Sequence, residues 1–166
     1  MDYKEFLEKK KHSIGDFGFE ANYIPDIAFD FQKEIIQRSL KKGRIGIFAD
    51  TGLGKTLMQL SIAKNVINHT NKKVLILTPL AVAFQFLLEA EKLGIDDIEY
   101  SKDGNHSKKI VICNYERLHY FNENDFIGVI CDESSILKNF DGKTKWAITK
   151  FMKKIPYRFL STATPS

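Results

Sequence analysis

One run in the first half of the chain combines glycines with a lysine and a hydroxyl side chain. The run reads Ala49-Asp50-Thr51-Gly52-Leu53-Gly54-Lys55-Thr56. It fits the phosphate-binding pattern G-x-x-x-x-G-K-[ST], with alanine in the first glycine position. Gly52 and Gly54 allow backbone N–H groups to wrap around phosphate oxygens, because no Cβ stands in the way. We expect Lys55 to reach the β- and γ-phosphates of a nucleotide and the Thr56 hydroxyl to bind Mg²⁺, with Thr51 and Leu53 in the same loop.

A pair of adjacent carboxylates forms the second candidate group. Asp132 and Glu133 follow the apolar stretch 127–131, which is typical of a buried strand. A phosphate-binding loop needs such partners, since one carboxylate can hold Mg²⁺ and the other can polarise the attacking water. We therefore assign Asp132 to the metal and Glu133 to the general base. Two solvated loop acids are the alternative for this dipeptide taken alone.

Two polar segments complete the set of candidate residues. Thr162-Ala163-Thr164 follows the apolar stretch 157–160, where small hydroxyl residues can hydrogen-bond the acidic pair and sense the γ-phosphate. The alternative is a serine/threonine turn closed by proline. Gln32 precedes the phosphate-binding run, and its amide offers one donor and one acceptor to adenine N6 and N7. A surface glutamine is the alternative there.

Helices and strands alternate around these residues. A helix is predicted over 31–42, with Asp30 as its N-cap and Gly43 ending it. Apolar stretches predict strands at about 44–49, 74–77, 98–100, 110–113, 127–131 and 157–160. Helical spacing predicts further helices over about 55–68, 81–93 and 144–153. This alternation indicates an α/β fold with a parallel sheet covered on both faces, whose ligands bind beyond the carboxyl ends of the strands.

Length and composition are those of one globular domain. The chain has 166 residues, of which 43% are hydrophobic and 28% charged. No apolar run approaches the ~20 residues that cross a membrane, and the N-terminus has no signal-peptide core. Cys113 and Cys131 lie in predicted strands, which favours reduced core thiols. These features favour the cytoplasm, of a bacterium or of a host cell if the protein is viral. The net charge of +4 permits a polyanionic partner without demanding one.

Basic and aromatic residues outside these motifs leave two interpretations open. Lys138, Lys143 and Lys145 belong either to a solvated loop or to a phosphate contact. Trp146, in a predicted amphipathic helix, is expected to pack in the core; a base-stacking platform is the alternative. Arginines matter because phosphoryl transfer often uses an arginine finger. The chain has only Arg38, Arg44, Arg117 and Arg158.

Taken in order, these segments resemble the first motor lobe of superfamily 2 helicases and translocases, of the DEAD-like and Swi/Snf-like kinds. The matching segments are Phe31-Gln32 for the adenine-reading Q motif, Ala49 to Thr56 for motif I, Leu77-Thr78-Pro79 for motif Ia, Cys113-Asn114-Tyr115-Glu116 for a nucleic-acid-contact motif, Asp132-Glu133-Ser134-Ser135 for motif II and Thr162-Ala163-Thr164 for motif III. The resemblance implies nucleic-acid contacts at Thr78, Pro79, Asn114 and Tyr115. It also implies a coupling role for Thr162, Ala163 and Thr164.

The resemblance implies more about architecture and function than the residues do. It implies a RecA-like lobe over 31–166 after an N-terminal extension over 1–30, with ATP and Mg²⁺ as cofactors and DNA or RNA as partner. The family's second lobe, which carries the arginine finger, has no counterpart among these residues. Two other classes stay open: a nucleic-acid-binding or interaction module with little ATP turnover alone, and a different P-loop enzyme such as a small kinase or an AAA-type ATPase.

Overall fold

A single parallel sheet organises the chain. The computed structural model describes residues 16–48, 54–132 and 138–162. The strands are β1 (Arg44–Phe48), β2 (Lys73–Thr78), β3 (Ile98–Tyr100), β4 (Ile110–Asn114), β5 (Phe126–Cys131) and β6 (Tyr157–Thr162). They pair in the order β1-β6-β5-β2-β4-β3, and every pair is parallel. The predicted parallel sheet is confirmed, and β6 lies between β1 and β5.

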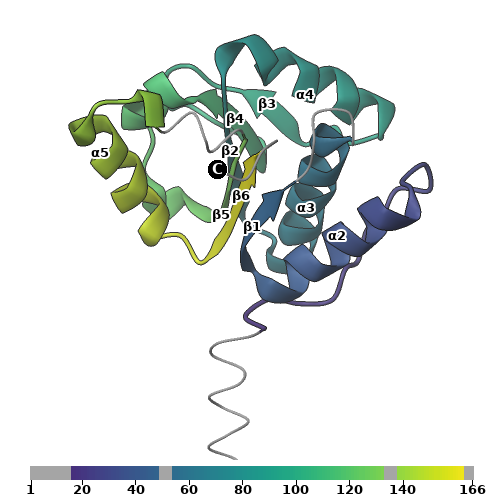
Figure 1. Ribbon diagram of the computed structural model, residues 1–166. Coiled ribbons are helices and arrows are strands. Elements are labelled where there is room, and N and C mark those ends of the chain that lie inside the picture. The colour runs from purple at the N-terminus through teal and green to yellow at the C-terminus, as the bar shows by residue number, and fades with distance from the viewer. Residues whose placement is uncertain (1–15, 49–53, 133–137, 163–166) are drawn as a thin grey trace, which may run out of the picture.

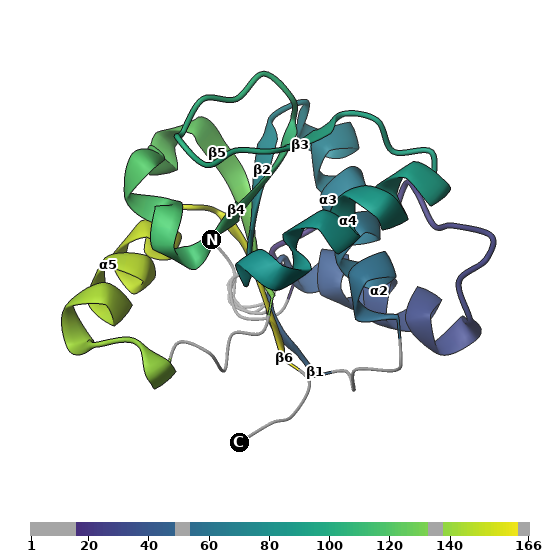
Figure 2. The ribbon, with the colours of Figure 1, turned by 90° about the horizontal axis from the view of Figure 1, so that it is seen from above.

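Helices cover both faces of this sheet (Figures 1 and 2). One face carries α2 (Asp30–Lys42), α3 (Lys55–Thr70) and α4 (Leu80–Lys92). The other face carries α5 (Gly142–Lys153) and the 3₁₀ helix η1 (Tyr115–Tyr120), with a short turn η2 (Glu123–Asp125) nearby in the chain. The predicted three-layer α/β architecture is confirmed. Within the described residues, no helix is long and apolar enough to cross a lipid bilayer.

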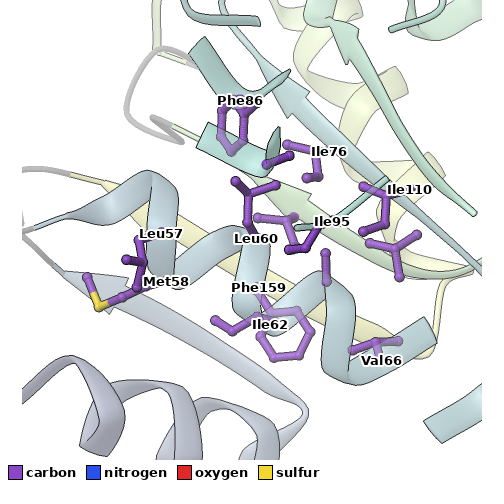
Figure 3. Close-up of a cluster of buried hydrophobic side chains, with 14 of the residues drawn as sticks. Leu57, Met58, Leu60, Ile62, Val66, Ile76, Phe86, Ile95, Ile110 and Phe159 are labelled. Carbon is purple, nitrogen blue, oxygen red and sulfur yellow. The ribbon is translucent and has the colours of Figure 1, made fainter. Parts of the chain in front are cut away.

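Alternation along the strands builds two cores, one on each face. In β2, Val74 and Ile76 pack toward α3 and α4, whereas Leu75 and Leu77 pack toward α5. Figure 3 shows part of the first core, where Ile76 and Phe159 from the sheet meet helix side chains. The central strands β2, β4 and β5 are buried on both faces, which explains their nearly continuous apolar runs.

The described part of the N-terminal segment packs on the first layer of helices. The backbone N–H groups of Gly18 and Phe19 donate to the carbonyls of Lys41 and Leu40, at 2.8 and 3.0 Å. These bonds satisfy carbonyls at the end of α2 that have no partner within the helix. A Cβ added at Gly18 would lie 1.6 Å from the Leu40 oxygen, so this close approach requires glycine. Residues from 16 onward are therefore built into the lobe.

The two thiols behave as core residues, as predicted. Cys113 and Cys131 are buried and form no disulfide with each other. Burial raises the pKa of Cys131 to about 12 and also raises that of Cys113. Both thiols are therefore neutral at physiological pH.

The prediction that Trp146 packs in the core is wrong. Its side chain is 65% exposed, while Ile148, Phe151 and Met152 form the buried face of α5. These three residues point toward the sheet, so Trp146 lies on the opposite side of the helix. The ring is consequently available to a partner.

Candidate active site

Two of the predicted site residues meet at the carboxyl edge of the sheet. Lys55 is the first residue of α3, and Asp132 follows β5 directly. The Lys55 Nζ lies 3.3 Å from Asp132 Oδ1, with the two side chains 12% and 3% exposed. Such a pair is stable only with good geometry and further hydrogen bonds, since both charges are removed from water.

Those further hydrogen bonds fix the Asp132 carboxylate from two sides. Thr78 Oγ1 donates to Oδ2 at 2.8 Å, and Gln59 Nε2 donates to Oδ1 at 3.1 Å. The backbone of Asp132 is also held, because its N–H donates to Leu77 O and Tyr115 OH donates to its carbonyl. The carboxylate is thus oriented before any ligand arrives, as metal-binding carboxylates are in proteins. Gln59 was not among the predicted site residues, although it lies one helical turn after Lys55, on the same face of α3.

Two buried polar atoms of this region lack a hydrogen-bond partner within the described part of the chain. They are Gln59 Oε1 and Ser161 Oγ, which lie in the second turn of α3 and near the end of β6. Leaving such atoms unpaired costs about 1–3 kcal/mol each. Mg²⁺ in proteins keeps several waters and one or two carboxylates. Asp132 beside the Gln59 acceptor therefore fits a hydrated Mg²⁺, and Thr56 in the first turn of α3 fits as a second oxygen ligand.

The N-terminus of α3 has the character of an anion-binding site. Gly54 precedes the helix in the left-handed region, with φ of 74°, and has no side chain that could cap it. The first turn contains no acidic residue. Its backbone N–H groups and the positive end of the helix dipole therefore favour a phosphate. The predicted loop residues Thr51, Gly52 and Leu53 lie outside the described residues.

A cavity of about 330 Å³ adjoins this helix terminus. Its lining residues are Gly54, Lys55, Thr56, Leu57, Val82, Gln85, Glu89 and Asp132. Lys55 and Asp132 give the cavity its charged end, and α4 forms its other wall. A larger cavity of about 500 Å³ lies across the sheet between η1 and α5, but apolar side chains dominate its lining. We place the chemistry in the smaller cavity, because its charged groups converge there.

Gln32 lies against the phosphate-binding segment. It is 4% exposed, and a Cβ added at Gly54 would lie 2.2 Å from its Nε2. Its Oε1 accepts a hydrogen bond from the Phe29 N–H at 2.8 Å. The predicted N-cap at Asp30 is wrong, because the helix begins at Asp30 and Phe29 is the cap residue. Gln32 thus lies beside Gly54, and its contact with adenine stays a prediction.

The predicted nucleic-acid contacts divide into buried and accessible residues. Thr78, Asn114 and Tyr115 are all buried, at 0%, 6% and 3% exposure. Thr78 and Tyr115 hold Asp132, and Asn114 accepts a hydrogen bond from Tyr100 OH at 2.7 Å. Thr78 and Tyr115 therefore support the candidate site, and the nucleic-acid contacts of Thr78, Asn114 and Tyr115 stay predictions. Pro79 is partly exposed, so its contact stays a prediction.

Most of the remaining predicted site residues lie outside the described part of the chain. Glu133, Ala163 and Thr164 lie outside the described residues. Thr162 ends β6, where it pairs with Phe48 of β1. Its backbone thus lies beside the strand that leads to the phosphate-binding run. The described ranges contain no cluster of three histidine, cysteine, aspartate or glutamate residues able to bind a metal.

Replacing Thr78 by valine is expected to destabilise the protein by about 1–3 kcal/mol, because Asp132 Oδ2 loses a buried donor. Urea unfolding measures this change. Thr149→Val is the matched control, since its hydroxyl bonds the Lys145 carbonyl on an exposed helix surface. It should change stability by less than about 0.5 kcal/mol. Equal stability of wild type and Thr78→Val would show that Thr78 does not hold the carboxylate.

Comparisons with known proteins agree with this geometry. Residues 27–166 match the family described as "Type III restriction enzyme, res subunit". The UvsW helicase of bacteriophage T4 superposes with a TM-score of 0.72 at 17% identity, over 99% of this chain and 61% of that one. The Sulfolobus solfataricus SWI2/SNF2 ATPase core gives 0.70 at 21% identity, over 89% and 33%. The same core in complex with double-stranded DNA gives 0.64 at 18% identity, over 92% and 34%.

These comparisons define the fold and the family. A search of curated protein sequences gives no significant match. The chain spans between about a third and three-fifths of the solved structures it resembles. Identities below 25% carry the fold alone, whereas the family match covers most of the chain. The chain therefore belongs to the family of type III restriction enzyme Res subunits, and it folds as the N-terminal RecA-like lobe of a superfamily 2 helicase.

Proposed function

We propose that this chain is the ATP-binding lobe of a motor that uses Mg²⁺-dependent ATP hydrolysis to translocate along or remodel nucleic acid. One observation carries the proposal: the buried Lys55–Asp132 pair lies at the N-terminus of α3 and faces a cavity. A cation, a carboxylate and the N-terminus of a helix are parts that bind and orient phosphate in phosphoryl transfer. The family membership supports the same function.

Each polar residue has a task in this proposal. Lys55 binds the β- and γ-phosphates, for which it leaves the Asp132 carboxylate. Thr56 and Asp132 hold the metal, which supplies charge neutralisation at the phosphate oxygens when it is bound. Gln59 and Thr78 keep the carboxylate oriented during this exchange of partners. Glu133 accepts the proton of the attacking water.

The nucleic-acid partner is supported by the likeness to motor proteins. The Sulfolobus solfataricus core was solved with double-stranded DNA, and the T4 protein is a helicase. Pro79, at the carboxyl end of β2, is the partly exposed candidate contact. A second lobe would close the cleft and complete the motor. DNA and RNA are both compatible with backbone contacts of this kind.

Base selectivity tests the assignment of the site to ATP. ATP should outcompete GTP, and Gln32→Ala should reduce this preference about tenfold, since a site built to hydrogen-bond its ligand loses affinity when a partner is missing. Competition against a labelled ATP analogue with Mg²⁺ measures both. Gln37→Ala, an exposed position on α2, is the control. No preference for ATP in the wild-type protein would remove Gln32 from the adenine site.

A further inference from the structure

The outer face of α5 concentrates positive charge around an exposed aromatic ring. Lys143, Lys145, Trp146, Lys150 and Lys153 all lie on this helix and are exposed. The helix contains no acidic residue. At 3.6 residues per turn, Lys143, Trp146, Lys150 and Lys153 fall within about 80° of one another around the helix axis. They form one stripe, which we call the α5 stripe.

Two carboxylates lie near this stripe, Asp141 close to Lys143 and Glu123 close to Lys150, but each has another bonded partner. Asp141 accepts a hydrogen bond from the Thr144 N–H, which caps α5. Glu123 pairs with Lys154, just after the helix, at 3.0 Å. Lys150 Nζ lies 4.9 Å from the centroid of the Trp146 ring. Within the described ranges, no carboxylate lies within 4 Å of the Lys143, Lys150 or Lys153 ammonium groups.

The α5 stripe lies away from the candidate active site. The helix covers the sheet face opposite α3 and α4 (Figures 1 and 2), and its buried side is filled by Ile148, Phe151 and Met152. Neither the fold nor the ATP site therefore requires lysines or tryptophan on the outer side. The charge pattern points outward, to a partner.

We propose that the α5 stripe is a binding site for single-stranded nucleic acid, separate from the cleft between motor lobes. The lysines contact successive phosphates, and the Trp146 indole stacks on one base. A polyanion with exposed flat bases satisfies both features at a regular spacing, whereas a duplex keeps its bases stacked and a run of carboxylates has no ring to stack on Trp146. The proposal rests on the proposed function only in taking nucleic acid as the polymer this chain handles.

Trp146 is the sole tryptophan of the chain, so its fluorescence reports on this site alone. Titration with single-stranded oligothymidylate should quench the emission, and the quench should disappear as salt rises. In the triple variant Lys143→Ala, Lys150→Ala, Lys153→Ala, the slope of log K against log salt should fall by about 2. Each phosphate contact on a single strand contributes about 0.7 to that slope. Unchanged emission on addition of saturating oligonucleotide would overturn the proposal.

Matched variants separate charge from stacking, with binding measured by anisotropy of a labelled oligothymidylate. Trp146→Ala should weaken binding about tenfold, while Trp146→Phe should retain most of the affinity. Lys92→Ala, Lys102→Ala, Lys108→Ala removes the same charge from exposed positions elsewhere and should leave the slope close to wild type. An equal loss in this control, or equal quenching by polyglutamate, would reduce the stripe to unspecific charge and overturn the proposal. Tighter binding of duplex than of single strand would also overturn it.

ATP binding and the oligonucleotide quench test the nucleotide site and the α5 stripe separately. Lys55→Ala should weaken ATP binding strongly and leave the oligonucleotide quench intact. Loss of the quench in a protein that binds ATP would reject the α5 stripe alone. An intact quench in a protein that fails to bind ATP would reject the nucleotide site alone.

Discussion

ATP hydrolysis by this chain alone is expected to be about 10³–10⁵-fold slower than hydrolysis by the same chain extended with a C-terminal lobe that supplies an arginine. The expectation follows from where its own arginines lie. Arg44 and Arg158 pair in register at the amino ends of β1 and β6, whereas the candidate active site lies at the carboxyl ends. Neither guanidinium is therefore near the place where the γ-phosphate would bind.

The other contacts of these arginines are structural. The Arg44 Nε donates to Pro156 O at 2.8 Å, and its guanidinium lies 4.0 Å from the centroid of the Phe17 ring. Arg158 donates to the carbonyls of Ile155 and Lys153 at the end of α5. Arg117 lies in η1 with its guanidinium 5.8 Å from the Tyr120 ring, and Arg38 lies in α2. None of the four lines the cavity beside Lys55 and Asp132.

Phosphate release in single-turnover and steady-state assays checks this expectation. The extended chain should show turnover that nucleic acid stimulates and Glu133→Gln abolishes. The chain alone should bind ATP and release phosphate at a rate close to background. Rapid turnover by the chain alone, abolished by Lys55→Ala, would mean that a complete ATPase is present within these residues.

Replacing Lys55 by alanine is expected to weaken binding of a Mg–ATP analogue at least about 30-fold. Removing one member of a buried charge pair costs about 2–5 kcal/mol, and each 1.4 kcal/mol is tenfold in affinity. The same change leaves Asp132 buried without this cation, so the melting temperature should also fall. Isothermal calorimetry and thermal unfolding measure the two effects separately.

Lys64 provides the matched control for this experiment. It lies on α3 like Lys55 but is partly exposed and away from the cavity lining. Lys64→Ala should leave both analogue affinity and melting temperature close to wild type. Equal affinity of wild type and Lys55→Ala would remove the lysine from the phosphate site and with it the proposed function.

The fold was predictable because its signals are local. Continuous apolar stretches alternating with helical spacing determine a parallel sheet, and the carboxyl ends of its strands then gather the polar residues at one edge. Lys55 and Asp132 could be paired in advance for this reason. The order of strands in the sheet depends on packing between distant segments, so no local pattern reveals it.

The direction of the side chains at the strand ends was not predicted, although the alternation along β2 indicates it for Thr78. Thr78 continues the alternation of Val74 and Ile76, which places it on the α3 side of the sheet and under Asp132. The Tyr115 hydroxyl can be buried because it donates a hydrogen bond to the Asp132 carbonyl. No local sequence pattern reveals this contact. Trp146 was wrongly predicted to be buried because it is hydrophobic. The buried face of α5 is formed by Ile148, Phe151 and Met152, and Trp146 lies opposite them.

Asp132 links the carboxyl ends of three strands. Its side chain accepts from Thr78 at the end of β2, its carbonyl accepts from Tyr115 just after β4, and it follows β5 itself. A ligand that moves the segments after β2 or β4 must therefore change the free energy of binding at Lys55. Thermodynamic linkage makes this coupling reciprocal, so ATP must change the affinity for that ligand by the same factor.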